Sequence, residues 1–157
     1  MAIKILEILR IALVGFAFYF GYSAGFENTY NPEAQLHIMI PIVIVAVAGL
    51  SGLEGLFLSK SAARAKGFET GSNYQIQSAI ALLSYTVISL MVYVFNWGLM
   101  AEITILFAFL FFMIFSAVNH TVDALKRNNF KWANINRPFL TLILVAGFFY
   151  PVYKVFI

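Results

Sequence analysis

The stretch Leu50–Ala79, LSGLEGLFLSKSAARAKGFETGSNYQIQSA, joins the end of one apolar segment to the start of the next through a basic loop. It places Glu54 inside the first segment and two glutamines at the start of the second. Apolar runs of about 17–25 residues, the length that crosses a bilayer as a helix, recur on both sides of it. This pattern predicts an all-α polytopic membrane protein in which residues 1–157 form a single integral membrane domain.

Composition excludes several other classes of protein. The chain has 62% hydrophobic and 11% charged residues, whereas an ordinary water-soluble domain has about 25% charged residues. It has no cysteine, which excludes disulfides, thiol nucleophiles and iron–sulfur clusters. The net charge of +3 arises from basic residues that flank apolar segments. We interpret them as topology signals and expect no nucleic-acid partner.

Five apolar segments are predicted to span the membrane as helices. They cover approximately residues 5–24, 37–58, 74–95, 99–118 and 138–156. The first resembles a signal peptide, but Tyr22 stands where a cleavage site needs a small residue, so we treat it as a membrane helix.

The basic residues predict how these segments are oriented. With the N-terminus inside and the C-terminus outside, nine of the ten Lys and Arg residues fall on the inner side, and only Lys154 lies outside. The positive-inside rule favours this orientation. We therefore expect a multi-pass protein of the cell (inner) membrane.

Glu54 is the first candidate for a functional site, because an ionisable side chain inside a transmembrane segment is costly. From the inner end of its segment it could reach the interface and meet Lys60 or Arg64, which is the arrangement we expect. Arg10 is likewise expected to pair with Glu7 or to extend to the lipid headgroups. If Glu54 instead faces the bundle, it could carry protons or a cation.

Other polar residues share the predicted depth of Glu54 at the inner mouth of the bundle. The candidate ligand-binding residues are Glu54, Ser72, Gln75, Gln77, Asn119 and His120. Hydrogen bonding between helices would explain the glutamines equally well. His120 and Asp123, three residues apart on one helix face, form only a weak metal pair, since a dedicated site needs three or four ligands.

The plain alternative for that pair is an interfacial histidine beside a carboxylate in a basic loop. His37 is predicted to lie across the hydrocarbon core from His120, about 30 Å away. The two histidines of one chain therefore cannot ligate a haem together. No haem, zinc or other cofactor is expected.

Small residues recur at a spacing of four in the second segment. Ala48 and Gly52, followed by Ser51 and Gly55, present a face that lets another helix approach closely. Ala48, Gly52 and Gly55 are the candidate helix-contact residues, and the face around Gly52 is a candidate surface for self-association.

Several positions in the basic loop and beyond form a recognisable pattern. Gly67-Phe68, Gly71-Ser72, Tyr74 and Gln75 are similar to a motif Gly-Trp, Gly-Ser, aromatic, Gln. That motif is typical of a family of small prokaryotic membrane proteins known only as a domain of unknown function. The resemblance covers approximately residues 49–150. It implies a multi-pass helical protein without an established activity.

Two further stretches resemble this family. Ala117-Val118-Asn119-His120 matches its Ala-x-x-His, and Asn134-Ile135-Asn136 resembles its Asn-containing loop before the last helix. Two positions depart from it: Phe68 replaces the usual Trp, and Gln77 stands where the family usually has Glu. If that Glu carries a proton or an ion, this chain lacks it unless Glu54 substitutes.

These observations predict a non-enzymatic membrane protein that binds or passes a small solute or ion at the inner mouth, or an oligomeric or accessory subunit. Its expected partners are membrane lipid and further copies of itself or other membrane subunits. The alternative is a small transferase-like membrane enzyme with a cytoplasmic-side site. Its residues would be Gln75, Asn119, His120, Arg64 and Arg127. No nucleophile–base pair at a fixed spacing supports that alternative.

Overall fold

The computed structural model describes residues 2–68, 70 and 72–157, and every regular element in this part of the chain is a helix. The prediction of an all-α fold is therefore confirmed. In chain order the elements are α1 (Ala2–Gly25), α2 (Pro32–Ile44), η1 (Val45–Gly49), α3 (Leu50–Phe57), α4 (Ser59–Lys66), α5 (Asn73–Val94), α6 (Leu99–Arg127) and α7 (Trp132–Phe156).

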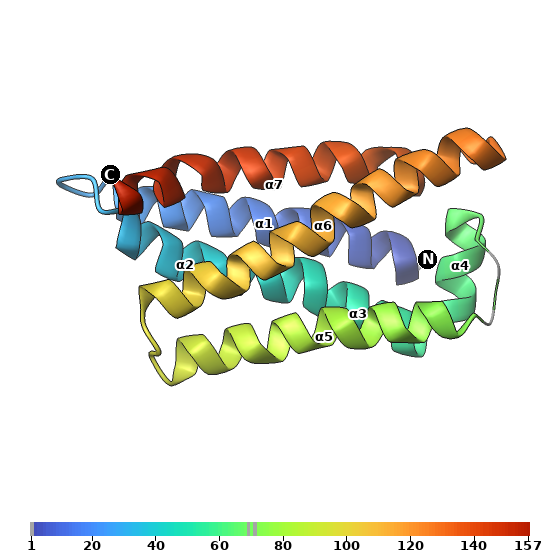
Figure 1. The fold of residues 1–157 in the computed structure, drawn as a ribbon, viewed down its shortest axis with the longest axis horizontal. Coiled ribbons are helices and arrows are strands. Elements are labelled where there is room, and N and C mark those ends of the chain that lie inside the picture. The colour runs from blue at the N-terminus through green and yellow to red at the C-terminus, as the bar shows by residue number, and fades with distance from the viewer. Residues whose placement is uncertain (1, 69, 71) are drawn as a thin grey trace.

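The long helices run along one axis of an elongated bundle (Figure 1). α2, η1 and α3 follow one another without a break, and η1 is a single wider π-helical turn. α2 contacts α1, α5, α6 and α7, so it is the central helix. The largest fully buried apolar side chains are those of Leu36, Met39, Ile40, Ile44, Leu106, Phe109 and Phe148.

Four helical stretches in the described residues are long and apolar enough to cross a membrane: Pro32–Phe57, Asn73–Val94, Leu99–Arg127 and Asn134–Phe156. The remaining expected span corresponds to α1, a helix of 24 residues that packs along α2. It is not among these four stretches, so the count of five spans and the orientation stay predictions.

The helices on either side of the last loop are longer than expected. The predicted loop Asn119–Arg137 shrinks to residues 128–131, because α6 continues to Arg127 and α7 begins at Trp132. Hydropathy marks only the apolar part of a helix, whereas α6 continues through a polar end with Lys and Arg in its last turn, where they suit the helix dipole. It ends at Asn128, whose φ of 51° is left-handed.

The small-residue face of the second segment is used within the chain. A Cβ atom added at Gly52 would lie 2.6 Å from Leu83 Cγ and 3.0 Å from the Ala79 carbonyl oxygen, and one at Gly55 would lie 2.7 Å from Ala79 Cβ. Ala48 is fully buried. This face therefore packs against α5 within the chain, and its use as a surface for self-association stays a prediction.

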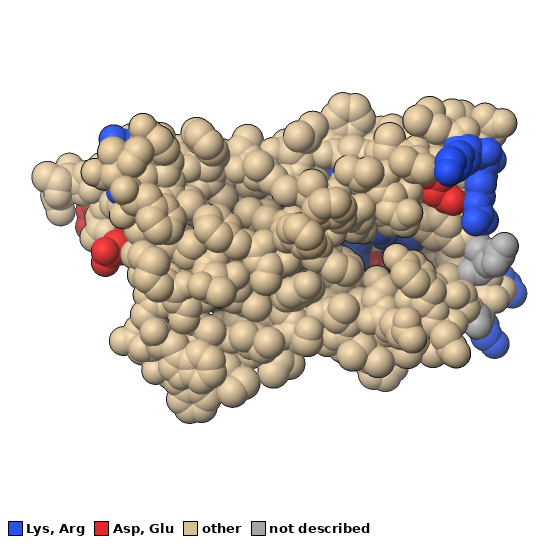
Figure 2. All heavy atoms as spheres, viewed as in Figure 1, with Lys and Arg blue, Asp and Glu red and all other residues tan. Residues whose placement is uncertain are grey.

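The two ends of the bundle differ in charge. The start of α1, the short helix α4, the end of α6 and the start of α7 meet at one end, which we call the basic end (Figure 1). Lys and Arg side chains gather there on the surface (Figure 2). The C-terminus and the turn between α5 and α6 lie at the opposite end.

Candidate functional site

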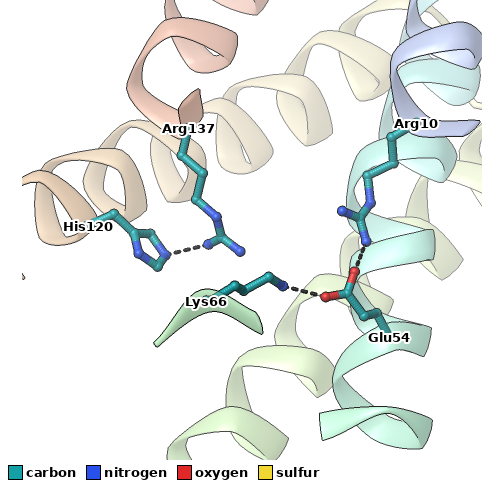
Figure 3. Close-up of polar contacts among 5 residues, drawn as sticks. All are labelled: Arg10, Glu54, Lys66, His120 and Arg137. Carbon is teal, nitrogen blue, oxygen red and sulfur yellow. Dashed lines mark hydrogen bonds and ion pairs between the residues drawn. The ribbon is translucent and has the colours of Figure 1, made fainter. Parts of the chain in front are cut away.

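A cavity of about 690 Å³ lies inside the bundle toward the basic end. Residues from α1, α3, α4, α5, α6 and α7 line it. Its charged lining residues are Arg10, Glu54, Lys66, Asp123, Arg127 and Arg137. Five side chains at its centre, which come from five different helices, are drawn in Figure 3.

Glu54 occupies the centre of the site and is only 2% exposed. Arg10 donates to its Oε2 atom and Lys66 to its Oε1 atom (Figure 3). The expected partners Lys60 and Arg64 were therefore wrong, as was Glu7 as the partner of Arg10. The physical reason is that Glu54 faces the interior, where α1 and the last turn of α4 bring the two buried cations.

Lys66 reaches Glu54 because the end of α4 is anchored to the turn between α6 and α7. The Asn129 side-chain amide donates to the Lys66 carbonyl oxygen at 2.9 Å and to that of Gly67 at 3.3 Å. Gly67 ends α4 with a φ of +75°, and a Cβ atom there would lie 2.8 Å from the Asn129 Oδ1 atom. A left-handed turn and close contact with Asn129 both favour glycine at this first position of the motif.

The Lys66 ammonium is buried, with 13% of its side chain exposed. Burial lowers its pKa below the ordinary value, and the positive charge of Arg137 lowers the pKa further, while Glu54 acts in the opposite direction. The ion pair with Glu54 thus stabilises the charged form of Lys66, which burial and the nearby positive charge of Arg137 disfavour.

His120 bridges two residues of α7. Its Nδ1 atom lies 2.8 Å from the Asn134 Oδ1 atom, and its Nε2 atom contacts the Arg137 guanidinium (Figure 3). Because an amide oxygen only accepts and a guanidinium only donates, the network assigns the proton to Nδ1 and a neutral imidazole. The Phe68 ring packs on the imidazole with centroids 5.3 Å apart.

This arrangement argues against the weak metal pair. Both ring nitrogens of His120 are engaged, and Asp123 pairs with Arg127 at 2.8 Å. Within the described part of the chain, no group of three or more His, Cys, Asp or Glu side chains could hold a metal ion.

Most of the other candidate residues reach the cavity. Ser72, Gln75 and Asn119 line it together with Glu54 and His120. Ser72 also caps α5, since its hydroxyl accepts a hydrogen bond from the Tyr74 amide at 3.2 Å. Gln77 is exposed on α5 and does not line the cavity. Glu69 and Gly71 lie outside the described residues.

Sequence reasoning missed four residues of the site, Arg10, Lys66, Asn134 and Arg137, because it treated the cations as topology signals. One signal was available for the last two. Asn134 and Arg137 are three residues apart, so they share a face if the helix begins before Pro138. They were instead placed in a loop.

The central cluster has an excess of positive charge. Among the described residues of this cluster, three cations, Arg10, Lys66 and Arg137, face the carboxylate of Glu54, which leaves two positive charges in excess. Among the described residues, Arg137 has no carboxylate at ion-pair distance, and the buried Arg10 Nε atom has no hydrogen-bond partner. Buried charge is costly unless it is paired, so this arrangement favours a negatively charged occupant.

The opposite end of the bundle has a separate polar pair. The His37 Nδ1 atom lies 2.6 Å from the Glu102 Oε1 atom, and the His37 ring packs on Tyr93 with centroids 4.7 Å apart. A second cavity lies beside this pair, and its lining shares no residue with the first. His37 and Glu102 therefore contribute nothing to the site at the basic end.

Comparison with known proteins identifies the family to which the chain belongs. A model of a family of unknown function, DUF6790, matches residues 5–152. The chain belongs to the DUF6790 family. The resemblance to an uncharacterised family is thus confirmed, while the motif and the prokaryotic origin stay predictions. No curated protein and no solved structure matches this DUF6790 protein.

Proposed function

We propose that this DUF6790 protein is a five-span membrane protein that binds a small anionic solute in the cavity at its basic end. The observation behind the proposal is the excess of two positive charges around Glu54, together with the missing carboxylate partner of Arg137 in the described residues. An anion would compensate these charges, which no carboxylate of the described residues pairs.

Arg137 and Arg10 are the residues best suited to hold the anion. A guanidinium offers up to five N–H donors and binds carboxylates and phosphates through two parallel hydrogen bonds. Arg10 and Arg137 both line the cavity. Among the described residues, the buried Nε–H group of Arg10 has no hydrogen-bond partner. Ser72, Gln75 and Asn119 add neutral polar groups to the same lining.

The proposed topology puts this cavity on the cytoplasmic side. Nine of the ten Lys and Arg residues belong to the basic end, which the positive-inside rule favours as the inner side. The length of α1 supports a fifth span, and the opposite positions of the two termini in the bundle support an odd number of spans. Self-association or assembly with other membrane subunits is a separate proposal.

A transferase-like enzyme is the second candidate. One observation favours it: His120 has an orienting partner in Asn134 and lies in the lining of the cavity. To act as a base, however, it would first have to release Arg137 from its Nε2 atom. An anion that draws Arg137 away would do so, which makes anion binding the first step in either case.

Binding is tested by thermal unfolding in phosphatidylcholine nanodiscs with phosphate, sulfate or acetate, each compared with chloride at equal ionic strength. We expect at least one oxyanion to raise the unfolding temperature of the wild type, because a ligand that binds only the folded state stabilises it. Arg137→Gln should lose this response, and its stability without oxyanion should equal or exceed that of the wild type because the substitution removes a partly buried cation that has no ion-pair partner among the described residues.

Lys154→Gln is the matched control, since it removes an exposed cation at the opposite end. It should keep the full response to oxyanions. If none of the three anions stabilises the wild type more than chloride does, or if Arg137→Gln responds like the wild type, the proposed function is wrong.

A further inference from the structure

The cavity opens on the side of the bundle. α5 and α6 lie close together at the opposite end and move apart toward the basic end (Figure 1). The contact between Tyr85 and Phe112, with ring centroids 5.7 Å apart, joins them near the middle of both helices. Beyond it, a hollow between these two helices exposes charged atoms deep inside (Figure 2). In a membrane, an opening in the side of a bundle faces lipid.

The lining of the cavity changes from charged to apolar with depth. On α1, α5, α6 and α7, and along the continuous stretch of η1 and α3, a polar lining residue is followed seven or eight residues toward the bundle centre by an apolar lining residue. This spacing is about 10–12 Å at the rise of an α-helix. The pairs are Arg10 and Phe18, Glu54 and Val47, Gln75 and Leu82, His120 and Phe112, and Arg137 and Leu144.

In all five pairs the polar residue lies nearer the basic end and the apolar residue nearer the bundle centre. The cavity therefore consists of a charged part at the basic end and an apolar part toward the bundle centre. A compact, water-soluble anion would use only the charged part. It would also have no need of an opening between α5 and α6. The apolar part and the side opening are therefore explained if the ligand has an apolar portion in addition to its negative charge.

We infer that the bound anion is the head of a single-chain amphiphile taken from the bilayer, with a phosphate or carboxylate group and a linear hydrocarbon chain. This inference rests on the proposed function. The head lies between Arg10 and Arg137, and the chain lies against Val47, Leu82 and Phe112. The ligand enters sideways between α5 and α6, so its chain never has to cross water.

The inference is tested with three probes on the full chain in phosphatidylcholine nanodiscs: methyl phosphate, decyl phosphate and decanol. They supply the head alone, the whole amphiphile and the chain alone. Thermal unfolding should respond to decyl phosphate at a concentration at least tenfold below that of methyl phosphate, and decanol should give no comparable shift.

Partition into the bilayer would by itself concentrate decyl phosphate, so a variant has to separate partition from binding. Leu82→Trp fills the apolar part of the cavity without changing a charged residue. We expect it to raise the half-effective concentration of decyl phosphate at least tenfold and to leave that of methyl phosphate unchanged. Leu90→Trp, at a lipid-exposed position of the same helix, is the matched control and should change neither.

A second filling variant protects the test against misfolding of the first. Gly15 lines the cavity, and a Cβ atom there would meet no other atom within 4 Å, so Gly15→Phe should fold and act as Leu82→Trp does.

Three results would overturn the inference: equal potency of methyl and decyl phosphate, a decanol shift equal to that of decyl phosphate, or unchanged decyl phosphate binding in both filled variants. In the first and third cases methyl phosphate binding would still leave the proposed function standing. Absence of any response to either phosphate would overturn the inference, and the proposed function would fail with it if sulfate and acetate also gave no response.

Discussion

Glu54 is the residue on which the inner part of the bundle depends, because it joins α1, α3 and α4 through two buried ion pairs. Glu54→Gln would leave Arg10 and Lys66 buried without a counter-charge. Loss of one partner of a buried pair costs about 3–5 kcal/mol, so we expect a large decrease in the free energy of unfolding. Chemical or thermal unfolding in nanodiscs measures it.

The control for this prediction is Glu33→Gln, an exposed carboxylate in the first turn of α2 at the opposite end. It should change stability by less than about 0.5 kcal/mol. Equal stability of the Glu54 and Glu33 variants would show that the buried pairs contribute nothing to folding.

The lowered pKa of Lys66 predicts that the stability of the protein depends on pH. Its pKa in the folded protein lies below the ordinary value of 10.5, chiefly because of burial. Between the two pKa values the unfolded chain binds more protons at this residue than the folded chain does. Its contribution to the free energy of unfolding therefore rises with pH through this window and is lowest below the folded pKa.

The measurement is the unfolding midpoint of wild type and Lys66→Met from neutral to alkaline pH. We expect the wild type to gain stability relative to Lys66→Met as the pH rises. Lys60→Met, which removes an exposed lysine of the same helix, should follow the wild-type curve. Parallel curves for wild type and Lys66→Met would contradict the assigned burial.

At the scale of elements, the contact between α3 and α5 depends on glycine. Gly52→Leu would place atoms within 3.0 Å of Leu83 and of the Ala79 carbonyl, so the two helices would have to move apart. Overpacking of this kind costs about 1–3 kcal/mol. We expect a matching loss of stability in thermal unfolding, with the mass of the protein particle unchanged.

Gly15→Leu makes the same substitution in α1, where a Cβ atom meets nothing within 4 Å, and it should be tolerated. If instead Gly52→Leu preserved stability and lowered the oligomer mass, the face would be an interface between chains.

The extended ends of α6 and α7 show what hydropathy cannot locate. His120 and Asn134 meet only because both helices continue beyond their apolar parts, and the loop between them is short. An apolar window ends where the polar residues begin, although the backbone stays helical. Expecting a loop over residues 119–137 therefore hid one side of the site.

At the scale of the whole molecule, the orientation in the membrane can be tested directly, because the chain has no cysteine of its own. Lys60→Cys places a thiol at the basic end and Asn28→Cys places one in the exposed turn between α1 and α2. With the N-terminus inside, a membrane-impermeant maleimide added to intact cells should label Asn28→Cys and spare Lys60→Cys. Permeabilised cells should allow labelling of both, and the reverse pattern in intact cells would invert the topology.

The sequence by itself determined the helical class, the apolar segments and the gathering of cations at one end. These follow from runs of consecutive residues, because a bilayer requires each span to satisfy its own backbone and to be apolar along its length. The same reasoning predicted that Glu54, Gln75 and His120 would lie at a common depth, and all three line the cavity.

Only the tertiary structure decided which charges meet. Arg10 is 44 residues from Glu54, Lys66 is 12 residues from it, and Arg137 is 17 residues from His120. Each pairing depends on the rotation and axial position of separate helices, which packing at glycines and in the core sets. A cation that orients the chain and a cation that faces a cavity look alike in sequence, because they differ only in the direction in which the helix presents them.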